Sequence, residues 1–256
     1  MTFPSSNLSI KTPTVSEKLQ PSTKKRPRAI TEPAIPEYLQ RVYWWAYLHP
    51  NAVRLFEREW LVNLILWGNY SRLRDAALAE LGATIQINLL QVACVYGDFT
   101  LRIAERLQQP GTLGVVDVAS IQLANLRAKL PAASTAILHQ QDSSALKFAD
   151  ASFDAVLLFF LLHEQPEAVR RNTLAEAMRV TRPGGRIIIV DYHNPKRRNP
   201  LRYLMKMVLT ALEPFARDLW RHEISHFLPA TNTPAALVKT TYFGDLYQKV
   251  VITKSA

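Results

Sequence analysis

Short apolar runs alternate with amphipathic segments through the middle of the chain, between residues 89 and 191. The run FDAVLLFFL is apolar almost throughout, as expected of a parallel strand that is buried on both faces. The segments between such runs carry apolar residues at helical spacing, so the pattern indicates an α/β fold with a parallel sheet. The predicted strands are 89–92, 112–118, 135–139, 153–161 and 186–191, and the predicted helices are 100–107, 121–129 and 167–180.

The end of the chain has the pattern of a β-hairpin. The runs 236–242 and 247–253 flank a turn at Gly244-Asp245. We therefore expect an antiparallel pair of strands to close the sheet.

Residues 36–81 are predicted to be mainly helical, with a break at His49-Pro50, and they contain four of the five tryptophans. This helical extension is interpreted either as a cover packed on the sheet or as a lid that faces a membrane. The segment 1–35 is rich in Pro, Ser, Thr and Lys and has no apolar periodicity, so we expect a disordered basic tail. Its composition fits a transit peptide only in part, and it has no secretory h-region. The remaining residues, 82–256, form the predicted α/β domain.

The stretch LLQVACVYGDFT predicts a strand, a tight turn and the start of a helix. In an open α/β sheet, such a junction brings backbone N–H groups and a helix N-terminus to an anionic or nucleotide-like ligand. The spacing of a G-x-G-x-G pattern falls on Ala93, Val95 and Gly97, so only the last glycine is present, and Tyr96 adds a phenol. Either the ligand is held in an altered way, or this turn no longer binds one.

Acidic residues follow the next strands. Asp117 ends the second predicted strand, some twenty residues after the turn, where nucleotide-binding α/β folds place a carboxylate for ribose hydroxyls. Asp142 lies just past the third strand. It is interpreted either as a second ligand contact or as the residue that forms an Asx turn or helix cap.

Several polar residues are predicted to converge at the carboxyl edge of the sheet. Their side chains suit a manganese- or magnesium-type ion or a general acid and base, although the spacing matches no recognised metal motif. The alternative is that they are satisfied polar groups in loops. They are Asp98, Asp142, His163, Glu164, Asp191 and His193.

The net charge of +10 favours an anionic partner. Residues 194–222 contain seven Lys or Arg against two acids around an apolar stripe, which predicts a basic amphipathic helix. Its basic side either binds anionic lipid headgroups or is simply solvated. The aromatic residues are not interleaved with the basic runs, which argues against nucleic-acid binding. A single cysteine, Cys94, excludes an intramolecular disulfide, and no apolar run is long enough to span a bilayer.

The order of these elements resembles the class I S-adenosylmethionine (SAM)-dependent methyltransferases from about residue 81 onward. The turn ACVYGDFT is similar to AGGTGDLT of the ubiquinone and menaquinone C-methyltransferases, sharing Ala93, Gly97, Asp98 and Thr100. It departs from them at Gln91, where they have an acid, and at residues 94–96. These departures, with YWWAYLHP, LVNLILWGNYSRLRDAAL and TTYFGDLYQKVV, resemble the rhodoquinone-biosynthesis methyltransferase-like family over nearly the whole chain beyond the tail.

This resemblance implies a Rossmann-like, doubly wound and mostly parallel sheet with a closing antiparallel hairpin and an N-terminal helical extension. It also implies a Mn(II)-dependent enzyme of anaerobic respiration that converts ubiquinone to rhodoquinone. A ring methoxy group is replaced by an amino group, with SAM as the amino donor. Two alternatives stay open: an ordinary SAM-dependent quinone methyltransferase, and a non-catalytic SAM-fold membrane adaptor.

Roles for individual residues follow from the resemblance. The expected catalytic residues are Tyr96, which stacks on or hydrogen-bonds the quinone, and His163 or Asp98 as the base. The expected SAM-binding residues are Ala93, Val95, Gly97, Asp117, Asp142 and Ser143. The expected Mn(II) ligands come from Asp142, His163, Glu164, Asp191 and His193.

Because ubiquinone dissolves in the bilayer, we expect peripheral binding to an anionic membrane surface. The aromatic N-terminal helices and the segment 196–206 are predicted to make this contact. The expected setting is the cytoplasmic face of a bacterial inner membrane or, alternatively, the matrix side of the mitochondrial inner membrane.

Overall fold

The computed structural model describes residues 1–2, 33–230 and 234–255. Residues 32–256 form one compact unit, which contains all the elements discussed below. The predicted disordered tail lies almost entirely outside the described residues. Within the described ranges, no helix combines the length and the apolar character needed to cross a bilayer.

The core of this unit is a seven-stranded sheet in the order β3-β2-β1-β4-β5-β7-β6, counted over the described residues. Strands β1 to β5 are parallel, and β7 runs antiparallel to both of its neighbours, β5 and β6. The chain order reverses between β1 and β4, which is where doubly wound sheets bind their ligands. The strands are β1 (Asn88–Val92), β2 (Thr112–Asp117), β3 (Ile137–Gln140), β4 (Phe153–Phe159), β5 (Thr181–Tyr192), β6 (Ala236–Tyr242) and β7 (Tyr247–Thr253).

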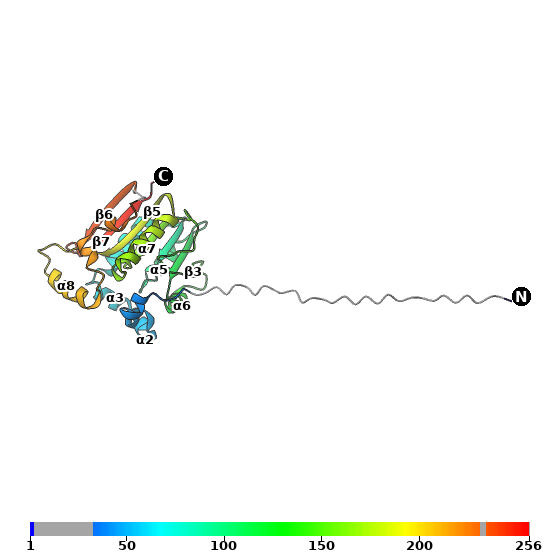
Figure 1. Cartoon of the computed structure of the whole chain (residues 1–256), viewed down its shortest axis with the longest axis horizontal. Coiled ribbons are helices and arrows are strands. Elements are labelled where there is room, and N and C mark those ends of the chain that lie inside the picture. Colours follow the sequence, from blue (N-terminus) through cyan, green and yellow to red (C-terminus); the bar gives the residue numbers. More distant parts are fainter. Residues whose placement is uncertain (3–32, 231–233, 256) are drawn as a thin grey trace. The chain divides into compact units, whose positions relative to one another are not determined.

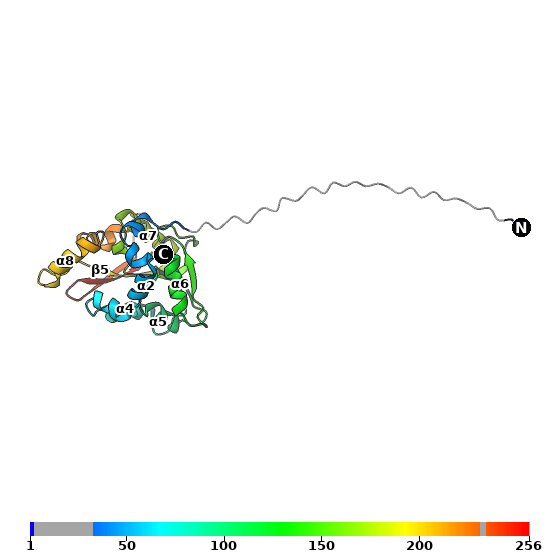
Figure 2. The same cartoon turned by 90° about the horizontal axis from the view of Figure 1, so that it is seen from below.

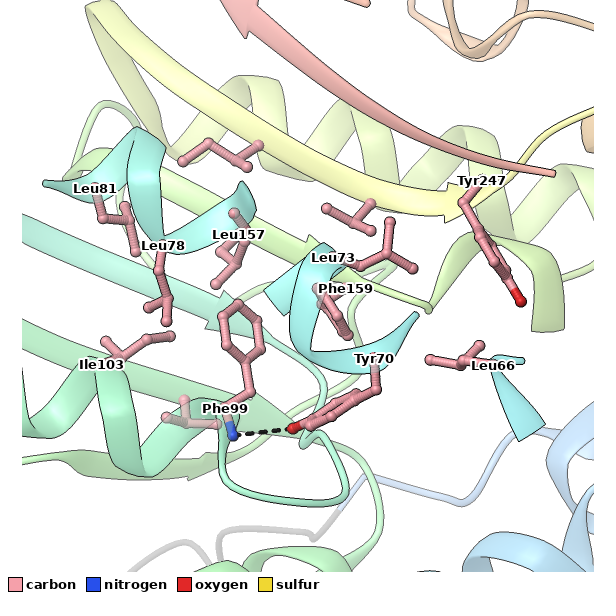
Figure 3. Packing of buried hydrophobic residues seen from close by; sticks show 14 of the residues in the cluster. Leu66, Tyr70, Leu73, Leu78, Leu81, Phe99, Ile103, Leu157, Phe159 and Tyr247 are labelled. Carbon is pink, nitrogen blue, oxygen red and sulfur yellow. Dashed lines mark hydrogen bonds between the residues drawn. The ribbon is translucent and has the colours of Figure 1, made fainter. Parts of the chain in front are cut away.

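Both faces of the sheet are covered, as the apolar run in β4 predicts. Leu157 and Phe159 belong to one buried cluster, whereas Val156 and Leu158 belong to the other, because successive side chains of a strand point to opposite faces. Figure 2 shows α4 (Tyr70–Leu81) and α5 (Phe99–Arg106) on one side of the sheet and α7 (Glu167–Val180) on the other. In Figure 3, side chains of α4 and α5 pack against those of β4. Leu126 of α6 (Ser120–Lys129) joins the same cluster as α4 and α5.

The helical extension begins with short helices at the carboxyl edge of the parallel strands, drawn in blue in Figure 1. Pro50 opens α2, where its missing N–H costs nothing, and His49 caps that helix by accepting from the N–H of Asn51. In contrast, α4 packs directly on the sheet, although the predicted boundary assigns it to the extension. The short elements are α1 (Glu37–Arg41), η1 (Trp44–Leu48), α2 (Pro50–Phe56) and α3 (Glu59–Ile65).

Most predicted strands and helices of the α/β domain agree with the structure to within two residues at each end, but two elements differ more. β5 begins at Thr181 and not at residue 186. Phe153 of β4 already pairs with Thr181, and a shift in register follows before the next pair. The residues of the predicted Pro-Gly-Gly turn are therefore part of the strand. The basic segment forms two helices, α8 (Leu201–Leu212) and α9 (Asp218–Arg221), and not one. Pro214 lies between them and cannot donate the backbone hydrogen bond that a continuous helix needs.

Candidate active site

A cavity of about 720 Å³ lies at the carboxyl ends of the parallel strands, under the N-terminal helices and α8. Its walls are mostly apolar, and its polar residues lie where the strands end. Of the predicted site residues, eight line the cavity: Ala93, Val95, Tyr96, Asp117, Asp142, Ser143, His163 and Glu164. Gly97, Asp98, Asp191 and His193 are not part of this lining.

The turn after β1 keeps only the last glycine of a glycine-rich turn, Gly97, yet its first position still has a glycine-like backbone conformation. Ala93 has φ of +72°, a left-handed conformation that is costly for a residue with a Cβ. The next residue, Cys94, donates its backbone N–H to Asp117 Oδ2 at 2.8 Å, which ties the turn to the end of β2. Such strain persists only where the surrounding structure fixes it, and it concentrates at functional sites.

Two carboxylates mark the crevice beside this turn. Asp117 accepts from the backbone N–H groups of Cys94 and Ala119, both at 2.8 Å, and retains lone pairs for further donors. Burial raises the pKa of Asp117 above its ordinary value, and these hydrogen bonds oppose that shift. Asp142 accepts from the backbone N–H and the hydroxyl of Ser144, so the predicted Asx-type turn is present. Because Asp142 also lines the cavity, the turn and a ligand contact are compatible.

Tyr96 joins the turn to the N-terminal helices. Its ring stacks on Tyr47 with 5.8 Å between centroids and on Phe56 with 5.9 Å. Its hydroxyl donates to Ala46 O at 2.7 Å and accepts from Gln122 Nε2 at 2.8 Å. The extension is therefore fastened over the crevice as a lid, and Tyr96 forms part of that fastening.

Glu57, from the loop after α2, makes a second connection to the turn. Its carboxylate accepts from the backbone N–H of Gly97 at 3.1 Å and pairs with Lys129 at 2.5 Å. Asn125 donates to the other oxygen at 2.5 Å. A negative group thus sits on the N–H of the remaining glycine, held by residues of α6.

His163 is the principal ionisable group in the cavity wall. Its Nδ1 lies 2.9 Å from Asp191 Oδ1, while its Nε2 lies 3.7 Å from Glu164 Oε1. Burial alone would lower the pKa of His163, but Asp191 and the other nearby carboxylates outweigh it and raise the pKa to about 9. The imidazole is therefore protonated at neutral pH.

Two further acids share this wall. Burial raises the pKa of Glu164, and Glu213 at the end of α8 adds to the shift, while the His163 imidazolium opposes it. Burial also raises the pKa of Glu213. Tyr47 donates its hydroxyl to Glu164, so the lid and the acidic wall are directly connected. The wall therefore combines one imidazolium with carboxyl groups that gain protons readily.

Asp98 points away from the cavity into a cluster of arginines. Its oxygens accept from Arg74 at 2.8 and 2.9 Å and from Arg102 at 2.5 Å. Burial would raise the pKa of Asp98, but the two guanidinium groups dominate and lower it. A carboxylate held in this way is a weak base, which argues for a structural role for Asp98 in place of the predicted catalytic one.

We expect Asp98→Asn to destabilise the fold by about 1–2 kcal/mol at pH 7, since Arg74 is buried and loses part of its counter-charge. Because the folded pKa of Asp98 is lowered, its contribution is present above the unfolded pKa of roughly 4 and is lost as the pH falls through the folded value. Urea unfolding of both proteins at pH 7 and pH 3.5 measures this difference. A gap that stays constant between the two pH values contradicts the assignment.

The predicted metal ligands do not assemble. Among the described residues, no group of three or more His, Cys, Asp or Glu is arranged to hold a metal ion. Asp191 is used by the backbone N–H groups of Leu162, His163 and Tyr192. His193 bonds Asp245 O at 2.9 Å. The five predicted candidates, all within the described ranges, therefore supply no set of three ligands for Mn(II).

Four residues of the site are absent from the sequence-based predictions: Tyr47, Glu57, Gln122 and Glu213. None of them lies at the end of a parallel strand, which is the rule that found Asp117 and Asp142. The available signal for Glu213 was an acid among apolar residues in LTALEPF, at the end of a helix whose apolar stripe predicts packing against the domain.

Comparisons with known proteins agree with this geometry. Residues 89–185 match the family described as a methyltransferase domain. A demethylmenaquinone methyltransferase from Lactiplantibacillus plantarum is 26% identical over 212 residues, covering 79% of this chain and 87% of the relative. One from Staphylococcus aureus is 26% identical over 145 residues, covering 57% of this chain and 58% of the relative, so this match spans little more than half of that protein.

Solved structures share the fold at low sequence identity. The N-methyltransferase NodS from Bradyrhizobium japonicum superposes with a TM-score of 0.53 at 13% identity, covering 73% of this chain and 99% of that one. A possible exported protein from Bordetella parapertussis gives 0.54 at 16% identity, covering 73% and 68%. The chain thus has the class I SAM-dependent methyltransferase fold, matches a methyltransferase-domain family over residues 89–185, and is similar in sequence to demethylmenaquinone methyltransferases.

Proposed function

We propose that this protein is a SAM-dependent transferase that acts on the ring of a membrane-dissolved quinone. One observation carries the proposal: a single cavity joins the acid-lined crevice at the strand ends to an apolar chamber whose wall contains His163. SAM fits the crevice, since Asp117 has lone pairs for ribose hydroxyls and the turn at Ala93 keeps its glycine-like path. The apolar chamber suits a quinone ring and the start of its isoprenoid chain.

His163 is positioned to control charge on the quinone. The Asp191 carboxylate lies 2.9 Å from Nδ1 and keeps the ring protonated, so Nε2 is able to donate a hydrogen bond into the cavity. When an amine adds to the quinone ring, negative charge develops on a ring oxygen, and a positioned cation there lowers the barrier. In methyl transfer the same cation stabilises the deprotonated ring hydroxyl from which the ring carbon attacks the methyl group of SAM. Glu164, with its raised pKa, is suited to exchange a proton with the reacting ring.

Substrate access is proposed from the lipid phase. Several apolar side chains line the cavity and are exposed to solvent as well, so they form its rim. They are Trp45, Leu55, Leu64, Ile65, Trp67 and Leu212, from the N-terminal helices and α8. Exposed apolar residues on this scale mark an interaction surface, and the positive net charge complements anionic lipid. We place this rim on the membrane, at the bacterial inner membrane or its mitochondrial counterpart.

The sequence relatives favour methyl transfer, since the two reported above are methyltransferases by name. A second candidate is replacement of a ring methoxy group of ubiquinone by the amino group of SAM, which yields rhodoquinone. The amine adds to the ring, the methoxy group leaves as methanol, and the bond between the nitrogen and the α-carbon of SAM must then break. The state of Gln91 favours it: this residue replaces the acid of the methyltransferases and is fully buried, bonded to Thr100 and to Ala93 O. No carboxylate at this position therefore binds the ammonium of SAM, and the amino group is not held away from the quinone. Dependence on Mn(II) belongs to this second candidate.

The test is a reaction of purified protein with SAM and a short-chain ubiquinone or demethylated quinone, each supplied in the oxidised and in the reduced quinol form, with and without Mn(II), followed by mass spectrometry. A product heavier by one methylene, with S-adenosylhomocysteine released, supports methyl transfer. A methoxy-to-amino mass change supports the second candidate. Unchanged quinones in a folded, SAM-binding sample contradict both and favour a non-catalytic adaptor.

A further inference from the structure

A second, smaller pocket lies between the segment after β5, α8 and α9, and it shares no lining residue with the active-site cavity. Its volume is about 270 Å³. Four of its seven lining residues are cationic and none is acidic. We call it the basic pocket; it is lined by Asn194, Arg202, Tyr203, Lys206, Arg217, Trp220 and Arg221.

Only some of the cationic side chains in the basic pocket have partners within the protein. Arg202 donates to Asn194 Oδ1 at 2.7 Å and lies over the Trp220 ring at 5.9 Å, so it belongs to the pocket wall. Arg221 has a carboxylate 3.6 Å away, on Asp218. Lys206 and Arg217 form no ion pair with any carboxylate in the part of the chain that the structure describes. Two cations therefore remain available to an external anion.

The indole of Trp220 forms part of the pocket wall. Arg202 lies over its ring, and its Nε1 is buried and has no hydrogen-bond partner among the described residues. The ring is therefore an aromatic wall beside Lys206 and Arg217, and its buried N–H does not face the open space of the pocket. Two cations without carboxylate partners beside this wall suit the oxygens of a phosphate group.

The surroundings point to a phosphate carried by a lipid. Tyr203, which lines the basic pocket, and Met207, one turn along α8, are 69% and 70% exposed. Both cartoon views place α8 at the periphery of the unit formed by residues 32–256, beyond β5 (Figures 1 and 2). A helix that presents exposed apolar residues next to cations lies in the interface of an anionic membrane. Leu212 of the same helix is part of the cavity rim, so the pocket and the rim lie on one helix.

We propose that the basic pocket binds the phosphate of an anionic phospholipid headgroup, with Lys206 and Arg217 as its cationic contacts beside the Trp220 ring. This inference rests on the proposed function, because it names the lipid contact that holds the cavity rim on the bilayer. Acyl chains would lie against Tyr203 and Met207, while the quinone enters past Leu212.

The test follows the indole N–H resonance of Trp220 by NMR, assigned with Trp220→Phe, during titration with dihexanoyl phosphatidylglycerol below its micelle concentration. The same lipid headgroup is then presented in vesicles containing phosphatidylglycerol, and vesicle binding is measured by flotation. The double variant K206Q/R217Q is compared with K147Q/R127Q, which removes two exposed charges that line neither pocket. Turnover of a soluble quinone analogue is recorded for every variant.

We expect the short-chain lipid to shift the Trp220 resonance and K206Q/R217Q to bind vesicles roughly 30-fold more weakly, with K147Q/R127Q near wild type. Turnover of the soluble analogue should be unchanged in both double variants. If both double variants bind vesicles equally weakly, the loss reflects the total positive charge and not the basic pocket, and the proposal is overturned. Saturation of the shift by inorganic phosphate at the same concentrations would assign the site to free phosphate, which also overturns it. Lipid binding without any quinone turnover contradicts only the proposed function.

Discussion

Replacing His163 by asparagine is expected to lower kcat by about 10²- to 10⁴-fold, the range that a positioned acid–base group contributes. Asparagine keeps a polar side chain in the cavity wall but cannot carry the positive charge that Asp191 sustains on the imidazole. The barrier therefore rises where negative charge develops on the quinone oxygen. The KM for SAM should change little, because His163 is not among the residues assigned to the nucleotide crevice.

The pH dependence tests the same role. Because the pKa of His163 is raised to about 9, its protonated form predominates below that pH and is lost above it. The wild-type kcat should fall as the pH rises through about 9, and the H163N profile should lack this limb. His139→Asn is the matched control, since this partly buried histidine on β3 lies outside the cavity lining. A kcat of H163N within threefold of wild type would remove His163 from the mechanism.

His163 shows which features of the site can be predicted from the sequence. An apolar strand followed by a His-Glu pair is visible in the sequence, and the sheet rule correctly places both residues at the crevice. The same rule misplaced His193. Along β5 the side chains alternate, so Tyr192 lines the cavity whereas Asp191 and His193 do not. Knowing that a residue ends a strand fixes the edge of the sheet it occupies, but not the face it points toward.

The central strands were predictable because burial on both faces leaves a continuous apolar run, as in β4. The closing hairpin was predictable because its turn is explicit in the sequence. The lid was not predictable in the same way. Tyr47 reaches Glu164 across 117 positions, and Glu57 reaches Lys129 across 72. Such contacts depend on how η1 and α2 pack over the sheet. The spacing of residues along the sequence does not predict that packing.

Replacing Gly97 by alanine is expected to destabilise the protein by about 2–4 kcal/mol. Gly97 has φ of +83°, so any Cβ there costs about 1 kcal/mol in backbone strain. In addition, the new Cβ would lie 2.6 Å from Tyr70 Oη and 2.9 Å from Cζ, closer than atoms in contact allow. Tyr70 is fully buried and cannot move outward without disturbing the core between α4 and β4 (Figure 3).

Displacing Tyr70 also breaks the hydrogen bonds that organise the turn. Its hydroxyl accepts from the backbone N–H of Phe99 at 3.2 Å, at the start of α5, and contacts Tyr96 O at 3.2 Å. Losing the partner of a buried N–H costs about 1–3 kcal/mol. Because the same turn borders the SAM crevice, G97A should weaken SAM binding as well as the fold.

Gly184 is the control for the backbone strain that a Cβ causes at positive φ. Its φ is +72°, close to that of Gly97, but a Cβ there would meet nothing within 4 Å. Urea unfolding should therefore give a loss of only about 1 kcal/mol for G184A, and the difference from G97A measures the clash with Tyr70. In the double variant G97A/Y70F the nearest oxygen is gone but Cζ remains, so stability should recover only in part. Equal destabilisation of G97A and G184A would show that Tyr70 yields freely and that the turn does not depend on it.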